Sequence, residues 1–209
     1  MRVFIGTDRR QPIAANVLAH SISERSSEPV CITKLHLHQL PITRKGLTEF
    51  TYSRFLVPYL CNYEGTALFL DADMLCLGDI KNLFSLADGS AVQVVKNKQR
   101  FEWPSLMLFN CEKLKHLDPH YVQEDEKLFS LNWAQEIGEL PNTWNHLVGY
   151  DAPTAAQIVH FTKGIPVWEE TKDCEYADLW HQERRQMMST CSFQELMGRS
   201  VHVVDSNDV

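Results

Sequence analysis

Residues 67–80 read ALFLDADMLCLGDI, an apolar run that ends in two aspartates separated by one alanine and then turns apolar again. The preceding TALFL segment is short and continuously apolar, which is typical of a strand buried on both faces of a parallel sheet. Open parallel sheets bind ligands beyond the carboxyl ends of their strands, where Asp71 is expected to lie. We therefore expect Asp71 and Asp73 to face a crevice at the edge of the sheet.

The spacing of the two aspartates suits the binding of one cation. Side chains two positions apart in an extended or tightly turned segment point the same way, so Asp71 and Asp73 converge while Ala72 points back. Carboxylate oxygens suit Mg²⁺ or Mn²⁺, and these ions keep open positions for the phosphates of a substrate. An isolated D-x-D can instead cap a solvent-exposed turn, so the metal hypothesis needs support from other segments.

The segments around this strand alternate between strand and helix patterns. Residues 2–5 predict a strand, residues 12–26 an amphipathic helix and residues 30–37 a second strand. Residues 47–65 predict a helix that is broken or ended near Pro58 and Gly65. Further strands are expected at 90–95, 105–111 and 157–161, and a polar helix at 175–189. The order predicts one α/β domain over residues 1–209 with a mainly parallel sheet flanked by helices.

Composition excludes several classes of protein. The chain has 209 residues, of which 44% are hydrophobic, enough to bury the core of one domain. A formal net charge of -7 with scattered Lys and Arg argues against a nucleic-acid partner. No segment reaches the roughly 18 apolar residues of a membrane span, and no signal-like stretch follows the start. We therefore expect a soluble, cytoplasmic protein without a transmembrane segment.

The cysteines and the end of the chain support two further expectations. Six cysteines without a C-x-x-C spacing, several inside apolar runs, predict reduced core thiols rather than disulfides. The chain stops soon after VHVVDSNDV without an obvious capping element, so it could be one domain of a longer polypeptide with further domains.

Several motifs, in order, resemble the GT-A-fold glycosyltransferases, especially glycosyltransferase family 8 and its relatives. The motifs are VFIGTD, TYSRFLVPYL, ALFLDADMLCLGDI, SLMLFN, LPNTWN and HFTKGIPVW, and the resemblance covers about residues 2–168. Its most specific parts are the strand-embedded D-x-D and the later H-F-x-x-G segment. The resemblance implies a Rossmann-like nucleotide-binding half over about residues 1–100 and an acceptor half over about 101–209. It also implies a UDP-sugar donor and a bound Mn²⁺.

The resemblance implies roles for residues in the first half of the chain. Gly6, Thr7 and Asp8 would bind the uridine at the end of the first strand. Arg54 would contact the donor near Asp71, because a guanidinium can neutralise phosphate or hold a metal-binding carboxylate bidentately. The alternative for Arg54 is an exposed helical arginine.

Other implied site residues come late in the chain. His160 would complete the metal site with the two aspartates, and Gly164 would lie beside the donor. Lys163 could neutralise the leaving diphosphate, although the family's lysine usually comes a few positions later. Gln135 and Glu136 stand where the family has D-Q-D, which would place either beside the anomeric carbon.

The implied reaction retains the anomeric configuration of the sugar. A covalent route would need a carboxylate such as Glu136 on the far face of the sugar. We favour a front-face reaction, in which the departing diphosphate accepts the proton of the acceptor and the metal, Lys163 or Arg54 stabilises the leaving group. Trp103, Pro104 and Ser105 replace an Asn-small-Gly step, so one expected sugar contact is missing.

These expectations define a function and two alternatives. The sequence favours a glycosyltransferase of glycan biosynthesis or protein glycosylation that takes UDP-glucose by default, or UDP-rhamnose, and extends a glycan acceptor. A weaker resemblance is to enzymes of bacteria and large DNA viruses that build surface glycans. One alternative is a haloacid-dehalogenase-like phosphatase with Asp71 as nucleophile. The other is a non-catalytic module that binds sugar nucleotides.

Two further sets of side chains are weaker candidates. His36 and His38 fall on one face of a predicted strand, but without a nearby acid or cysteine they are expected to be surface residues. Trp144 and Trp168 are the tryptophans best placed to stack on sugar rings, because indoles suit apolar sugar faces.

Overall fold

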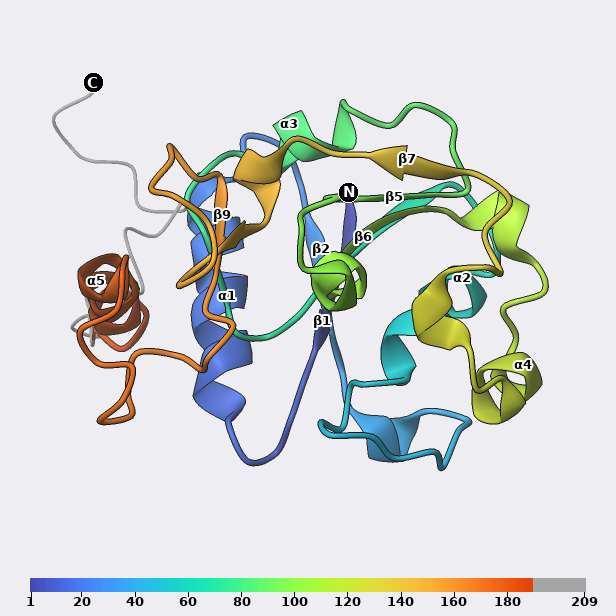
Figure 1. The fold of residues 1–209 in the computed structure, drawn as a ribbon, viewed down its shortest axis with the longest axis horizontal. Coiled ribbons are helices and arrows are strands. Elements are labelled where there is room, and N and C mark those ends of the chain that lie inside the picture. Colours follow the sequence, from blue (N-terminus) through green and yellow to red (C-terminus); the bar gives the residue numbers. More distant parts are fainter. Residues whose placement is uncertain (190–209) are drawn as a thin grey trace, which may run out of the picture.

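Short apolar runs build a six-stranded sheet at the centre of the protein (Figure 1). The structure is a computed structural model that describes residues 1–189. Cys191 and the VHVVDSNDV segment therefore lie outside the described residues. In space the strands follow the order β2 (Cys31–Leu35), β1 (Arg2–Gly6), β3 (Thr66–Leu70), β6 (Leu106–Asn110), β5 (Val92–Val94) and β7 (Ile137–Glu139).

The sheet is mostly parallel, as predicted, with one strand reversed. β1 is parallel to β2 and to β3, and β5 is parallel to β7, whereas β6 is antiparallel to both of its neighbours. The first residue of β6, Leu106, pairs with the last residue of β3, Leu70. The segment that precedes β6 is therefore brought to the carboxyl end of β3, directly beside the D-x-D pair.

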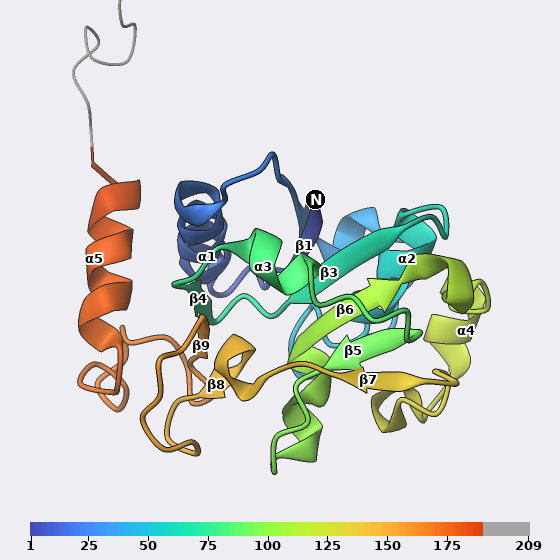
Figure 2. The same cartoon turned by 90° about the horizontal axis from the view of Figure 1, so that it is seen from above.

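A small second sheet brings the two halves of the chain together. It consists of β4 (Met74–Cys76), β9 (Ile158–His160) and β8 (His146–Leu147), in the order β4-β9-β8. The strand predicted at 157–161 is thus confirmed as β9, although it lies outside the main sheet. β4 and β9 are antiparallel, and Met74 pairs with His160. This register places His160 next to the D-x-D pair. Figure 2 shows β4 beside β9.

Helices and 3-10 turns surround the sheets. The α-helices are α1 (Pro12–Arg25), α2 (Val57–Leu60), α3 (Ile80–Phe84), α4 (Pro119–Glu124) and α5 (Ala177–Met187). The 3-10 turns are Leu37–Gln39, Ser53–Leu56, Arg100–Ser105, Cys111–Leu114, Leu128–Ser130 and Asn142–Trp144. Within the described part of the chain, no helix is long and apolar enough to cross a membrane. The cytoplasmic location stays a prediction.

The helix predicted at 47–65 is much shorter in the structure. Only residues 53–60 are helical, as a 3-10 turn that continues into α2. Pro58 does not end this helix, because it lies in the first turn of α2, where a missing N–H costs no hydrogen bond. The helix ends instead before Asn62 and Tyr63, which both have positive φ angles.

The second predicted strand is also shorter than expected. β2 ends at Leu35, and the chain then enters a 3-10 turn, so His36 and His38 do not lie on one strand face. Of the cysteines in the described residues, Cys61, Cys76 and Cys111 are buried free thiols, as predicted for core cysteines, whereas Cys31 is exposed and Cys174 is half-buried.

A buried carboxylate joins α5 to α1, which lie side by side in Figures 1 and 2. Glu183 is 2% exposed, and its oxygens lie 2.5 Å from His20 Nδ1 and 2.7 Å from an Arg25 terminal nitrogen. Because a buried carboxylate needs such partners, these contacts fix α5 against α1.

We expect Glu183→Ala to lower the free energy of unfolding by about 2 kcal/mol, because the Arg25 guanidinium and the His20 imidazole lose their shared acceptor. Urea denaturation followed by circular dichroism measures this loss. Glu169→Ala is the matched control, because Glu169 forms an exposed ion pair with Lys172, and such pairs contribute less than about 1 kcal/mol. Equal unfolding free energies for the two variants would contradict this account of the contact between α5 and α1.

Candidate active site

Asp71, Asp73 and His160 converge at the carboxyl end of β3. One potential ligand atom from each residue lies within 4.8 Å of the other two. Asp71 Oδ1 and Asp73 Oδ1 are buried and accept no hydrogen bond in the described residues, and each has a single ion-pair contact, with Arg54 Nη2 at 3.1 Å and with His160 Nε2 at 3.4 Å. Buried carboxylate oxygens are normally paired with hydrogen-bond donors or cations, so this group of atoms fits a divalent ion.

The turn between β3 and β4 is fixed from two sides. The Asp71 N–H donates to the Ser105 carbonyl at 2.9 Å, and the Asp73 carbonyl accepts from the Phe161 N–H at 2.9 Å. Ala72, between the two aspartates, is buried. The main-chain contacts come from the segment before β6 and from the residue after β9, so both sheets hold the aspartates in place.

The imidazole of His160 is oriented by a chain of buried polar side chains. Its Nε2 faces Asp73 at 3.4 Å, and its Nδ1 lies 3.1 Å from Asn145 Oδ1. The Asn145 amide nitrogen donates to Ser105 Oγ at 3.0 Å, which fixes the direction of that amide. Nδ1 is therefore the donor, so in the neutral imidazole Nε2 carries the lone pair, and that nitrogen is the one that could bind a cation.

Arg54 is a buried partner of Asp71. Its Nη2 lies 3.1 Å from Asp71 Oδ1, and its Nη1 donates to the Pro104 carbonyl at 2.8 Å. The residue is 6% exposed, and its guanidinium lies over the Phe69 ring at 5.2 Å. The alternative of an exposed helical arginine is therefore wrong. The predicted contact with the donor stays a prediction.

Glu102 is a member of the site that the sequence did not single out. Its Oε2 lies 3.9 Å from His160 Nδ1, and its side chain is 14% exposed. Burial raises the pKa of the Glu102 carboxyl, while His160 lowers it. Glu102 reaches the site because β6 is antiparallel to β3. A sequence pattern that predicts a strand does not give the direction of that strand in the sheet. The only signal for Glu102 in the sequence is its position shortly before β6.

Burial and neighbouring charges change the protonation of the metal-ligand candidates. Burial raises the pKa of Asp71 to about 7, although the Arg54 guanidinium favours the ionised form. Burial alone would lower the pKa of His160, but the carboxylates of Asp73 and Glu102 outweigh it and raise that pKa to about 8. Without a cation, the cluster therefore holds protons near neutral pH.

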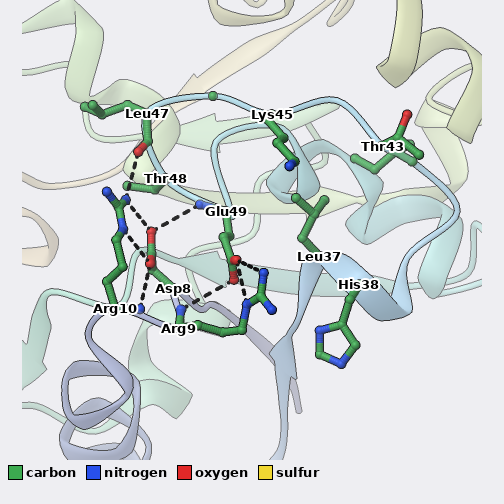
Figure 3. A pocket seen from close by; sticks show the side chains of 12 residues that line it. Asp8, Arg9, Arg10, Leu37, His38, Thr43, Lys45, Leu47, Thr48 and Glu49 are labelled. Carbon is green, nitrogen blue, oxygen red and sulfur yellow. Dashed lines mark hydrogen bonds and ion pairs between the residues drawn. The ribbon is translucent and has the colours of Figure 1, made fainter.

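Two cavities lead from the end of β1 to this cluster. The larger, about 430 Å³, is shown in Figure 3, and the smaller is about 100 Å³. Asp8, Arg10 and Thr48 line both cavities, so the two lie next to each other. The smaller cavity also contains Asp73 and Gly164. A ligand in the larger cavity could therefore extend through the smaller one to the aspartates.

The three residues predicted to bind uridine differ in their access to the cavities. Gly6 ends β1, and a Cβ there would lie 2.6 Å from the Phe50 ring, so only glycine fits without movement. The Thr7 hydroxyl donates to the Leu35 carbonyl. Asp8 alone among the three lines both cavities. The predicted position at the strand end is correct, and the binding of uridine stays a prediction.

Gly164 and Trp168 lie close to each other at the smaller cavity. Gly164 lines it with φ of 107°, and a Cβ there would lie 3.3 Å from the Trp168 ring. Trp168 is 47% exposed and remains free to stack on a sugar, whereas Trp144 is 4% exposed and belongs to the core. Lys163 is exposed, with its amino group 5.9 Å from the centre of the Tyr150 ring. Its predicted role at the diphosphate stays a prediction.

The structure does not bring Gln135 and Glu136 to the aspartates. Both are exposed just before β7, and Glu136 pairs with Lys113 at 2.9 Å. The pairing across the sheet runs from Ile137 to Val92, from Val92 to Phe109 and from Phe109 to Ala67. Glu136 therefore lies level with the amino end of β3, at the opposite end from Asp71. The strand register explains why positional matching to the D-Q-D pattern misplaced these residues.

Comparisons with known proteins agree with the fold. The glycosyl transferase family 8 profile matches residues 8–113 of this chain. Protein CDI of Arabidopsis thaliana is 38% identical over an alignment of 224 positions that covers 87% of this chain and 85% of that protein. The name of that relative assigns no reaction.

Solved structures of glycosyltransferases have the same fold. An active-site mutant of LgtC superposes with a TM-score of 0.68 and 11% identity, covering 93% of this chain and 99% of LgtC. Galactosyltransferase LgtC with donor and acceptor sugar analogs gives a TM-score of 0.65, with 10% identity over the same shares of both chains. GlyE of Streptococcus pneumoniae TIGR4 gives 0.64 at 15% identity, covering 88% of this chain and 59% of GlyE. At these identities the likeness shows the GT-A fold.

We expect the affinity for Mn²⁺ to rise with pH, because the cation must displace protons from the cluster. The pKa of His160 is about 8 and that of Asp71 about 7, so both groups lose their protons as the pH rises from 6 to 9. The affinity should increase at least tenfold over this range, with proton release on binding. Isothermal titration calorimetry in buffers of different ionisation enthalpy measures both effects. A constant affinity would contradict the assignment of these residues as ligands.

Proposed function

This chain belongs to glycosyltransferase family 8, and from that membership we propose that it transfers a sugar from a UDP-sugar to a glycan acceptor. The single observation that carries the proposal is the cluster of Asp71, Asp73 and His160 at the carboxyl end of β3. These residues would hold Mn²⁺ or Mg²⁺. A divalent ion there would neutralise the diphosphate of the donor as it leaves.

The two adjoining cavities support a nucleotide-sugar as donor. The larger has room for a nucleoside beside Asp8, and the smaller connects it with Asp73. A diphosphate in the smaller cavity would lie next to the proposed metal. UDP-glucose is the default donor. UDP-rhamnose is the alternative, because Trp103 and Pro104 stand where relatives have a sugar contact.

We propose a front-face reaction with retention of configuration. The bond between the anomeric carbon and the diphosphate oxygen breaks, and the acceptor oxygen bonds to the same face of the sugar. The proton of the acceptor hydroxyl passes to the departing diphosphate, so no enzymic base is needed. Glu136, the carboxylate considered for a covalent route, lies at the other end of the sheet. Arg54 would act by holding Asp71, and Lys163 would add positive charge at the leaving group.

One of the two alternative functions is excluded, and the other can be tested. Family membership makes the chain a glycosyltransferase, and the phosphatase hypothesis is therefore wrong. It also placed the D-x-D after the first strand of the fold, whereas Asp71 follows β3. The other alternative, a module that binds sugar nucleotides without turnover, can be distinguished from an active enzyme by a donor-hydrolysis assay. An active enzyme would slowly hydrolyse its UDP-sugar in the absence of an acceptor.

We expect Asp73→Asn to abolish most of the Mn²⁺ dependence of UDP binding. The substitution keeps the shape of the side chain and removes a charge that the cation needs. Transfer should collapse while the fold persists, because Asp73 lies in a turn at the strand end. Titration of UDP with and without Mn²⁺, for wild type and variant, measures the effect.

The matched control is Asp178→Asn, which removes a charge from the exposed first turn of α5. This control should bind UDP as the wild type does under both conditions. If Asp73→Asn also binds UDP like the wild type with and without Mn²⁺, the proposed metal site is wrong.

We expect the first-formed product to keep the anomeric configuration of the donor, because the attack and departure proposed here take place on one face of the sugar. Proton NMR of the product, recorded before mutarotation, gives the configuration directly. An inverted linkage would overturn the front-face mechanism while leaving the metal site unaffected.

A further inference from the structure

Arg10 and Asp8 form an ion pair where the two cavities meet (Figure 3). Arg10 Nε donates to Asp8 Oδ1 at 2.9 Å, and Nη2 donates to Oδ2 at 2.6 Å. Nη2 also donates to the Leu47 carbonyl at 2.8 Å. The other terminal nitrogen, Nη1, has no hydrogen-bond partner within residues 1–189. The guanidinium is therefore fixed on one side and free on the other.

The acceptor capacity of Asp8 is fully used by this arrangement. Besides the guanidinium, the Arg10 N–H donates to Oδ1 at 2.9 Å and the Glu49 N–H to Oδ2 at 3.3 Å. Each carboxylate oxygen thus accepts two hydrogen bonds, which is its full capacity. These bonds lower the pKa of Asp8 to about 2, so the carboxylate stays charged and keeps holding Arg10. No acceptor remains on Asp8 for a nucleobase while the pair is intact.

The start of α1 adds partial positive charge to the wall of the smaller cavity beside Arg10. Gln11 and Ala14, from the start of α1, line it together with Arg10 and Asp73. α1 spans Pro12–Arg25, and its N-terminus has no side-chain cap and no acidic residue in its first turn. The uncapped end of a helix of this length carries partial positive charge that favours anions.

We propose that Arg10 is a diphosphate-binding residue of this enzyme and that Asp8 is its positioning residue rather than a reader of the base. The inference rests on the function proposed above. The donor's diphosphate would lie between the free side of the Arg10 guanidinium, the start of α1 and the cation-binding aspartates. A guanidinium suits this task because its planar donors bind phosphate oxygens in pairs.

Calorimetric titrations of uridine and of UDP with Mn²⁺ separate this role from others. Arg10→Gln should weaken the binding of UDP at least tenfold and change that of uridine less than threefold, because uridine has no phosphate. Arg9→Gln is the matched control, since Arg9 pairs with Glu49 and lines the larger cavity but not the smaller one. The ratio of UDP to uridine affinities should stay at the wild-type value in this control.

Asp8→Asn tests the positioning role. Asp8→Asn should weaken the binding of UDP less than Arg10→Gln does. The double variant should bind UDP with the same affinity as Arg10→Gln alone. If Asp8 reads the base, Asp8→Asn instead weakens uridine itself, which would overturn its assignment as a positioning residue. If the Asp8–Arg10 pair only anchors the 41–49 segment, Arg10→Gln weakens both ligands equally or neither, which would overturn the proposal for Arg10. Failure of wild type to bind UDP with Mn²⁺ would reject the proposed function and this inference with it.

Discussion

The pairing of β4 with β9 is the contact on which the site depends. Met74, the residue after Asp73, pairs with His160, so a histidine from far along the chain lies beside Asp73. In the main sheet, Leu70 pairs with Leu106. This pairing brings the Ser105 carbonyl to the Asp71 N–H, which donates to it and holds Asp71 in place. Because both registers are fixed by buried strands, a slip of one residue in either would separate the ligands.

The charges of the cluster explain why it is built so rigidly. Three carboxylates, from Asp71, Asp73 and Glu102, face one guanidinium and one imidazole in a partly buried space. Burying this much negative charge is unfavourable unless it is paired, and the raised pKa values of Asp71 and His160 express that cost as bound protons. A divalent cation offsets the same charge without protons. The network around His160 keeps its ligand atoms aligned in either state.

Sequence patterns predicted the parts of this arrangement that depend on local chemistry. The buried strand before Asp71 and the spacing of the two aspartates were readable from apolar and polar order alone. His160 was identified through the family pattern, because no local signal links it to residues so far away in sequence. Asn145 ends the LPNTWN motif, but sequence patterns assigned it no role, because its contact with His160 depends on the pairing of β8 with β9. Glu136 was misplaced because strand register across a sheet is a long-range property.

The segment before β6 shows how a departure from the family pattern can be absorbed by the site. Ser105 stands in the step where the family resemblance implied a sugar contact, yet its hydroxyl accepts from the Asn145 amide and its carbonyl accepts from the Asp71 N–H. Pro104 presents its carbonyl to Arg54, and Glu102 adds a carboxylate beside His160. These residues are buried or nearly so, whereas Arg10 retains a 68% exposed side chain at the rim. If the buried inner set holds the proposed cation and the exposed rim contacts the donor, residues at the rim could change to suit another donor without disturbing the cluster.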